Sequence, residues 1–201
     1  MARRAQVGSS TRRDRIPFIS EEVNQIISNI ETETGDPLLA QSLEFSPTAL
    51  THIKRLMMYG GSIIVDTNLM VNDVEQMLED NPDVSLRCFL DQPEVIKLAS
   101  IHHSTRAEIA ADLGLATPGL KLMVVSTAPA TLNRIITRRK REPMTDVCVL
   151  AAPVGFASVV QLKEKLRESD MAYIVTRGKQ GGNAATVAIL GNILKAIREK
   201  Q

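Results

Sequence analysis

Four segments rich in polar residues and glycine follow apolar runs of strand length, and they hold the residues best suited to contact a ligand. They are Asp66-Thr67-Asn68 and residues 126–129, 152–156 and 176–183. The carboxyl ends of parallel strands meet at one edge of an open α/β sheet, and ligands bind in the crevice outside that edge. The spacing therefore predicts one binding site assembled from all four segments.

The last of these segments is typical of an anion site. Gly178, Gly181 and Gly182 precede a helical pattern, and the free backbone N–H groups at the start of a helix bind anions. Arg177 and Lys179 add positive charge to it. The segment lacks the spacing of a P-loop, so a nucleotide phosphate is not indicated, and an organic carboxylate fits equally well.

Thr105-Arg106 is a second candidate for anion binding. An arginine can hold a carboxylate through two parallel hydrogen bonds, which suits the recognition of a polyacid. The alternative is a surface arginine that pairs with Glu108 or with a neighbouring chain.

Three further residues of the predicted site have both a binding and a structural interpretation. Asp66 either contacts a ligand or caps the turn that follows it. Pro153 and Gly155 either line the site or only shape the turn after their strand. The residue types do not decide between these alternatives.

Metal and hydrolase chemistry have no supporting motif in the chain. His102 and His103 are adjacent in a predicted helix, where neighbouring side chains point in different directions, so they do not form a two-histidine metal site. No Cys/His cluster, HExxH motif or nucleophile elbow occurs. Cys88 and Cys148 lie far apart inside apolar runs, which predicts buried free thiols. We expect no metal site.

The elements that position these residues alternate between strand and helix. Residues 20–35 and 46–61 are helical patterns, each begun by a serine and ended by glycine. Apolar runs of strand length span residues 62–65, 85–90, 120–125, 146–151 and 172–176. Helical patterns follow them at residues 71–79, 93–113, 129–139, 159–168 and 183–199. Strands that are apolar on both faces predict a three-layer, doubly wound α/β fold with a mainly parallel, five-stranded sheet.

Length and charge limit the classes of function. The 201 residues suffice for one domain with a substantial core, which we expect over residues 16–201. The 24 Lys and Arg residues nearly balance 23 Asp and Glu residues, which argues against a general nucleic-acid-binding protein. Residues 1–15 carry five arginines with no apolar stretch after them, so they predict a flexible basic arm and not a secretory signal. No apolar run reaches the roughly 20 residues of a membrane span, and we expect a soluble cytoplasmic protein.

Five motifs occur in an order that resembles a known family. Residues 60–71 resemble the "GAPIvtDTnMV" segment of precorrin-8X methylmutases (precorrin isomerases), and Thr105-Arg106 resembles their "TRSA". Residues 125–132 resemble "GNAPTAL", residues 153–163 match "PVGFvgaaesK", and residues 177–183 match "RGrkGGS". The order and spacing hold from about residue 45 to residue 194.

The resemblance implies a flavodoxin-like sheet, a homodimer, and a pocket near the dimer interface where the arginine of the "TR" motif reaches a neighbour's ligand. Family members move a methyl group from C11 to C12 of a corrin precursor and use no separate cofactor. The implied partner is therefore a tetrapyrrole that carries many carboxylates. The expected substrate-binding residues are Asp66, Thr67, Thr105, Arg106, Thr127, Pro153, Gly155, Arg177, Gly178 and Lys179.

The histidine of the family's "vIHttGd" motif, taken to protonate the macrocycle, is missing. An ungapped alignment from Phe45 places Thr32 at that position, with Gly35 at the glycine of the motif. In the alternative alignment, residues 19–31 form the family's first helix and the histidine-bearing helix has been shortened away. Four other family residues differ as well: Ser126 and Thr127 replace glycine and asparagine, and Ala107 and Asn183 replace serines.

The missing histidine leaves several hypotheses open. Threonine cannot supply a proton near neutral pH as imidazole can, so Thr32 predicts an inactive catalytic position. The chain is then a corrin-precursor-binding member of the family whose methylmutase activity is in question, or a divergent isomerase that uses His102 or His103. A different class of function is a non-catalytic tetrapyrrole carrier, or a partner that passes intermediates between enzymes. A flavin-binding domain is a fourth hypothesis, which no residue pattern supports.

Overall fold

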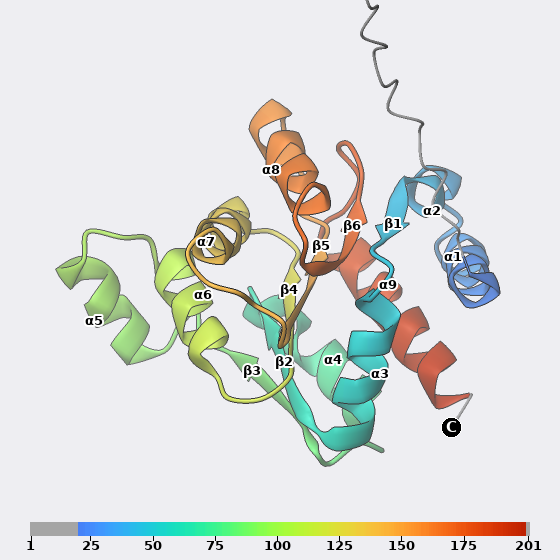
Figure 1. Ribbon diagram of the computed structural model, residues 1–201, viewed down its shortest axis with the longest axis horizontal. Coiled ribbons are helices and arrows are strands. Elements are labelled where there is room, and N and C mark those ends of the chain that lie inside the picture. The colour runs from blue at the N-terminus through green and yellow to red at the C-terminus, as the bar shows by residue number, and fades with distance from the viewer. Residues whose placement is uncertain (1–19, 200–201) are drawn as a thin grey trace, which may run out of the picture.

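The computed structural model describes residues 20–199, in which a six-stranded sheet is covered by helices on both faces (Figure 1). The strands are β1 (Leu43–Phe45), β2 (Gly61–Val65), β3 (Val84–Cys88), β4 (Lys121–Val125), β5 (Val147–Ala151) and β6 (Ala172–Thr176). They lie in the order β1-β6-β5-β4-β2-β3. From β2 to β6 all pairings are parallel, and from the β3 edge these strands follow the 2-1-3-4-5 order of flavodoxin-like sheets.

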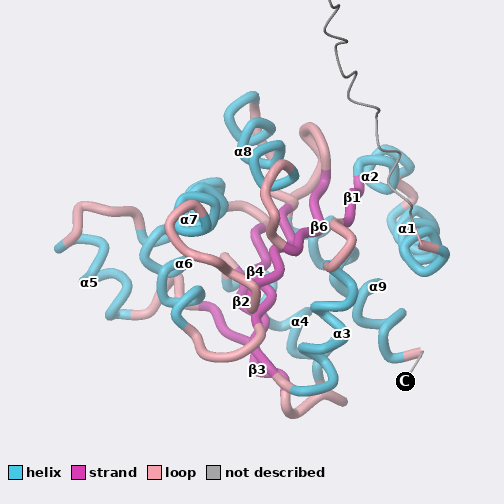
Figure 2. Tube along the Cα trace, in the orientation of Figure 1, coloured by secondary structure: helices cyan, strands magenta, loops and turns pink. Residues whose placement is uncertain are grey.

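Two layers of helices enclose this sheet, as the tube trace shows (Figure 2). One layer consists of α1 (Glu21–Thr34), α3 (Ala49–Tyr59), α4 (Val71–Leu78) and α9 (Asn183–Arg198). The other consists of α5 (Pro93–Ile101), α6 (Arg106–Ala116), α7 (Pro129–Arg139) and α8 (Ala157–Arg167). Alternate residues of β2 face opposite layers, because Ile63 and Val65 belong to the first core and Ile64 to the second. The three-layer α/β prediction is therefore confirmed.

The predicted strand count of five is wrong by one edge strand. β1 pairs antiparallel with β6, with Leu43 opposite Thr176 and Phe45 opposite Ile174. A short helix, α2 (Pro37–Ser42), precedes it, and Asp36 caps that helix by accepting the Leu39 N–H at 2.9 Å. Three residues are too few to show strand periodicity, so neither element was expected from the sequence.

The prediction of one helix over residues 93–113 is also wrong, because the helix is interrupted between α5 and α6. His103 adopts a left-handed backbone conformation with φ of 49°, which an α-helix does not accommodate. Thr105 caps α6 and exchanges hydrogen bonds with Glu108 in a capping box. The Thr-x-x-Glu spacing of that box was a sequence signal for the break, but the apolar pattern on either side concealed it.

The other predicted elements are confirmed to within a few residues. Ser20 caps α1 and Gly35, with φ of 62°, ends it, as the sequence predicted. Cys148 is a buried free thiol and Cys88 is a half-buried one. No helix within residues 20–199 is long and apolar enough to cross a membrane. The predicted basic arm, residues 1–15, lies outside the described residues.

Candidate functional site

Asp66 lies at the switch point of the sheet, where chain order reverses between β2 and β4. Its buried carboxylate accepts the backbone N–H groups of Ser126, Thr127 and Ala128 at 3.0, 2.9 and 2.8 Å, and the Ser126 hydroxyl at 2.7 Å. These four hydrogen bonds join the end of β2 to the loop before α7. The turn after Asp66 is capped by Thr67, which accepts the Leu69 N–H at 3.3 Å. Asp66 therefore fixes the neighbouring loop, and its carboxylate is occupied by the chain itself.

Ser126 also links this point to the start of α9. Its hydroxyl oxygen lies 2.6 Å from the side-chain amide of Asn183. The atom of that amide that faces Ser126 is Oδ1, so the single hydroxyl hydrogen of Ser126 lies between two acceptors, Oδ1 of Asn183 at 2.6 Å and the Asp66 carboxylate at 2.7 Å. At these two positions the family motifs have other residues, glycine where this chain has Ser126 and serine where it has Asn183. The two residues that differ from the family motifs are therefore in contact with each other.

Lys163, on the buried face of α8, holds the loop between β6 and α9. Its ammonium donates to the Thr176 hydroxyl at 3.0 Å and to the carbonyls of Gly178 and Gln180 at 3.2 and 2.7 Å. Burial lowers the pKa of Lys163 to about 8. Lys163 is the last residue of the motif over residues 153–163, but it was not among the predicted site residues. Its spacing from the buried Val159 was a signal that its side chain points inward.

The same loop packs closely against the segment after β5. The N–H of Gly182 donates to the carbonyl of Ala152 at 2.8 Å. A Cβ atom on Gly181, which has φ of 139°, would lie 1.9 Å from that carbonyl oxygen. Only glycine fits there, so the loop that carries Arg177 is held against the Ala152-Pro153 segment.

This loop presents two cations that are not used inside the protein. The side chains of Arg177 and Lys179 are exposed and have no hydrogen bond or ion pair within residues 20–199. Beside them α9 begins at Asn183; its N-cap residue is Gly182, so no side chain caps the helix and its first N–H groups are free. Anion binding by this loop stays a prediction, for which two exposed cations and the free N–H groups would supply the donors.

Exposed apolar side chains lie on the loops of the same edge. Val154 is 55% exposed and Phe156 is 84% exposed, both in the segment between β5 and α8. Leu69, in the turn after β2, is 75% exposed. Val154 lies next to the start of α9, because a Cβ atom on Gly182 would be 3.3 Å from it. The edge thus offers cations beside apolar surface, which suits a ligand with an apolar body and anionic arms.

Arg106 lies apart from this group. Its guanidinium donates to Asp91 at 2.8 Å, and the Asn68 amide donates to the same carboxylate at 2.6 Å. The alternative partner Glu108 instead bonds to Thr105, and these bonds lower the pKa of Glu108. Asp91 follows β3, which is four strand spacings, about 19 Å, from β6. One chain does not bring Arg106 together with the cations after β6.

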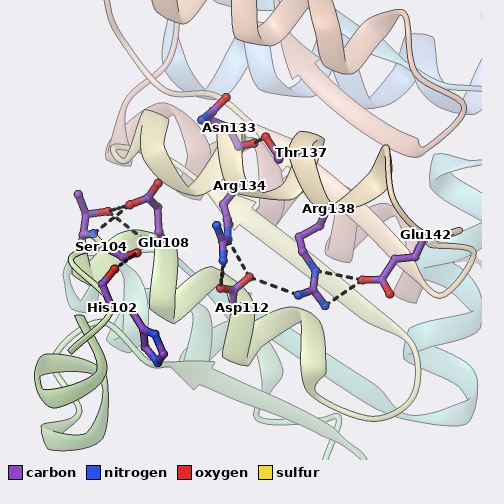
Figure 3. Close-up of polar contacts among 10 residues, drawn as sticks. His102, Ser104, Glu108, Asp112, Asn133, Arg134, Thr137, Arg138 and Glu142 are labelled. Atoms are coloured by element: carbon purple, nitrogen blue, oxygen red, sulfur yellow. Dashed lines mark hydrogen bonds and ion pairs between the residues drawn. The ribbon is translucent and has the colours of Figure 1, made fainter. Parts of the chain in front are cut away.

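Helix α6, which begins at Arg106, is tied to α7 by an ion-pair network (Figure 3). Arg134 donates a bidentate pair of hydrogen bonds to the Asp112 carboxylate, from Nε at 2.9 Å and from Nη2 at 2.6 Å. Arg138 lies 3.9 Å from Asp112 and 2.9 Å from Glu142. These contacts fix the position of α6, and in Figure 3 the ring of His102 points away from the other side chains drawn.

Neither Thr32 nor any described histidine side chain bonds to the loop that carries the two cations. Thr32 is exposed on α1 and donates its hydroxyl to the carbonyl of Ser28 at 2.9 Å. The rings of His102 and His103 are exposed and form no hydrogen bond or ion pair with any described residue. His52 is buried and bonds to the carbonyl of Lys121, at the start of β4 and thus at the opposite edge of the sheet. Within residues 20–199 no group of three metal-ligating side chains is present either.

Comparisons with known proteins show which proteins the chain is similar to. The family model described as precorrin-8X methylmutase matches residues 4–196. The chain is 26% identical to the cobalt-precorrin-8 methylmutase of Methanothermobacter thermautotrophicus over 191 residues, which cover 92% of this chain and 89% of that protein. It is 27% identical to the cobalt-precorrin-8 methylmutase of Salmonella typhimurium, covering 90% and 85%. The structure of a precorrin-8X methylmutase from Thermus thermophilus shares the fold, with a TM-score of 0.78 at 22% identity, covering 90% and 89%.

Replacing Asp66 by asparagine tests its part in holding the edge together. An amide oxygen cannot accept all four donors, and its NH2 group would face backbone N–H groups, so we expect a loss of about 3 kcal/mol in the free energy of unfolding. Asp91→Asn is the matched control at an exposed carboxylate, for which we expect a change below about 0.5 kcal/mol. Urea denaturation followed by circular dichroism measures both. Equal losses in the two variants would contradict the role of Asp66.

Lys163→Met tests the pH dependence that a buried lysine confers. The folded chain releases the Lys163 proton at a pKa of about 8, whereas the unfolded chain keeps it up to the ordinary value of 10.5. Between these values the unfolded state binds more protons, so the stability of wild type relative to Lys163→Met should rise with pH, by about 2 kcal/mol from pH 7 to pH 10.

The measurement is urea denaturation of both proteins at several pH values. The other groups with shifted pKa values, among them Cys88, Cys148 and Tyr173, occur in both proteins, so their contributions cancel in the difference. A difference that stays constant with pH would show that burial does not shift the pKa of Lys163.

Proposed function

The chain belongs to the precorrin-8X methylmutase family, and from this premise we propose that it acts in cobalamin biosynthesis by binding a tetrapyrrole polycarboxylate at the carboxyl edge of its sheet. One observation carries the proposal. The loop after β6 presents Arg177 and Lys179 without internal partners, next to the uncapped start of α9. Carboxylate arms of such a ligand fit this group of donors, since charged donors bind carboxylates more strongly than neutral ones do.

The apolar side chains beside the cations fit the rest of such a ligand. Phe156 and Val154 are exposed in the loop after β5, and Val154 lies beside the start of α9. Burying exposed aromatic and aliphatic surface against a large ring gains free energy in proportion to the area removed from water. Cations and apolar surface therefore support one ligand with both characters.

We extend the proposal to a homodimer in which Arg106 serves the ligand of the neighbouring chain. In one chain, about 19 Å separates the end of β3, near Arg106, from the end of β6. Arg106 is half-exposed and pairs with an equally exposed Asp91, so a ligand carboxylate can replace that partner at little cost. The dimer geometry implied by the family supplies the second chain.

Members of the family move a methyl group from C11 to C12 of the precursor. If this chain catalyses the same reaction, we expect its rate to be low. Loss of a general acid typically costs on the order of 10²–10⁴ in rate, and Thr32 cannot replace imidazole. A non-catalytic carrier is the second candidate function. It is supported by the absence of any imidazole bonded to the carboxyl-edge loops among the described residues.

Titration with precorrin-8X or hydrogenobyrinic acid, followed by absorbance, tests the binding proposal. We expect saturable binding by wild type, and binding about tenfold weaker for Arg177→Gln and for Lys179→Gln, because each removes a charged donor. Lys195→Gln, an exposed lysine in the last turn of the same helix α9, is the control and should bind as wild type does. Absence of saturable binding, or equal affinities in all four proteins, would overturn the proposal.

Thr32→His tests which alignment is correct and whether the wild type lacks an acid. If Thr32 occupies the histidine position, conversion of precorrin-8X should rise by about 10²–10⁴ in the variant, seen as the spectral shift of the product. Glu31→His, one residue earlier on α1, is the control and should give no gain.

Two other outcomes separate the remaining hypotheses. Turnover by wild type that disappears in His102→Ala or His103→Ala would identify a divergent isomerase. Tight binding of the product with no turnover in wild type or Thr32→His would support the carrier.

A further inference from the structure

A second candidate site lies at the amino edge of the sheet, opposite the carboxyl-edge loops. A cleft of about 320 Å³ opens between the start of α3, the loop before β5 and the loop before β6. Its floor includes Val147 and Ala172, the first residues of β5 and β6. Each strand has five residues and spans about 16 Å, so this cleft does not overlap the predicted ligand site.

The lining of the cleft provides cationic and hydroxyl donors that the described residues do not use. Arg55 is exposed on α3 and has no hydrogen bond or ion pair within residues 20–199. The hydroxyls of Thr48, Thr51 and Thr145 line the same cleft, and none of them bonds to another described residue. These four side chains can all donate to one anion.

The start of α3 adds backbone donors to this lining. Thr48 is the N-cap residue of this eleven-residue helix, yet its side chain makes no capping hydrogen bond. The N–H groups of the first turn carry partial positive charge and favour an anion in front of them. Helix, hydroxyls and guanidinium thus all favour negative charge.

His52 is the buried polar side chain of the cleft, only 6% exposed. Its Nε2 lies 3.2 Å from the carbonyl oxygen of Lys121, and since a carbonyl can only accept, Nε2 carries the hydrogen. Burial lowers the pKa of His52, although the Lys121 carbonyl opposes this, with smaller effects of Arg55, Asp146 and Lys121. The neutral ring therefore has a lone pair on Nδ1, which bonds to no other described residue.

The remaining charges of the cleft do not repel an anion. Asp170 lines it, but its carboxylate pairs with Arg139, which lowers the pKa of Asp170. Because Arg139 and Asp170 neutralise each other, the lining residues carry a net charge of +1, which comes from Arg55. Met144, Val147 and Ala172 supply apolar surface beside these groups.

We propose that this cleft binds a phosphate monoester with a small apolar group. The phosphate oxygens accept from Arg55, the threonine hydroxyls and the start of α3, while the O–H that the monoester keeps in its monoanionic form, below its second pKa of about 6, donates to Nδ1 of His52. A carboxylate has no such hydrogen, so it meets the same cations but leaves His52 without a donor. The apolar group packs against Met144 and Val147. At about 320 Å³ the cleft is at the lower end of small-molecule sites, which suits a phosphate with one ring.

Phenyl phosphate is the probe, with the ring signals of His52 followed by NMR. We expect saturable shifts with a dissociation constant on the order of 1 mM, weakened about tenfold in Arg55→Gln and about threefold in Thr51→Val. Benzoate tests the carboxylate and phenol the apolar group alone, and both should bind at least about tenfold more weakly. Arg177→Gln, at the opposite edge, should leave the affinity unchanged.

Several results would overturn the proposal. They are no saturable shift of His52, equal affinity in wild type and Arg55→Gln, benzoate or phenol binding as tightly as phenyl phosphate, or weakening by Arg177→Gln. Because His52 lies at the amino edge, failure here would leave the tetrapyrrole proposal untouched, and the converse also holds. Matching backbone NMR spectra of the variants and the wild type establish that each variant is folded.

Discussion

The buried carboxylate of Asp66 is the constraint on which the carboxyl edge depends. A buried charge is costly unless it is hydrogen-bonded, and Asp66 meets this condition with three backbone N–H groups and one hydroxyl from the loop after β4. Through Ser126 and Asn183 the same set of contacts reaches α9. Three segments that are distant in the sequence, after β2, after β4 and before α9, are therefore fixed relative to one another.

Lys163 holds a second loop of the carboxyl edge, the loop after β6. It is the buried cation that fixes the loop after β6, as Asp66 is the buried anion that fixes the loop after β4. In both cases the chain's own backbone and hydroxyl groups satisfy the charge. Arg177 and Lys179 take no part in this scaffold, which leaves them for a ligand. The division between buried charges that hold loops and exposed charges that we propose bind the ligand is the main physical property of this edge.

Helix α3 gives the opposite edge a different character. It begins next to the first residues of β5 and β6 and bonds through His52 to the start of β4. Its uncapped start faces a cleft that contains unpaired donors, whereas the uncapped start of α9 faces the carboxyl edge. Each edge of one sheet thus has a helix start with cations beside it, and the apolar surroundings of the two differ.

The sequence by itself determined most of the elements, and the family. Apolar runs located five strands, serine and glycine fixed the ends of α1, and five motifs in order led to the family, because each of these signals is local. Other features were decided only by the tertiary structure. β1 exists through its pairing with β6, the partners of Asp66 lie 60 to 62 residues away, and those of Lys163 belong to another element. The residue types had left Asp66 open between a ligand contact and a cap. Its burial against a distant loop decided its structural role, because a side chain's partners depend on which segments the fold brings together.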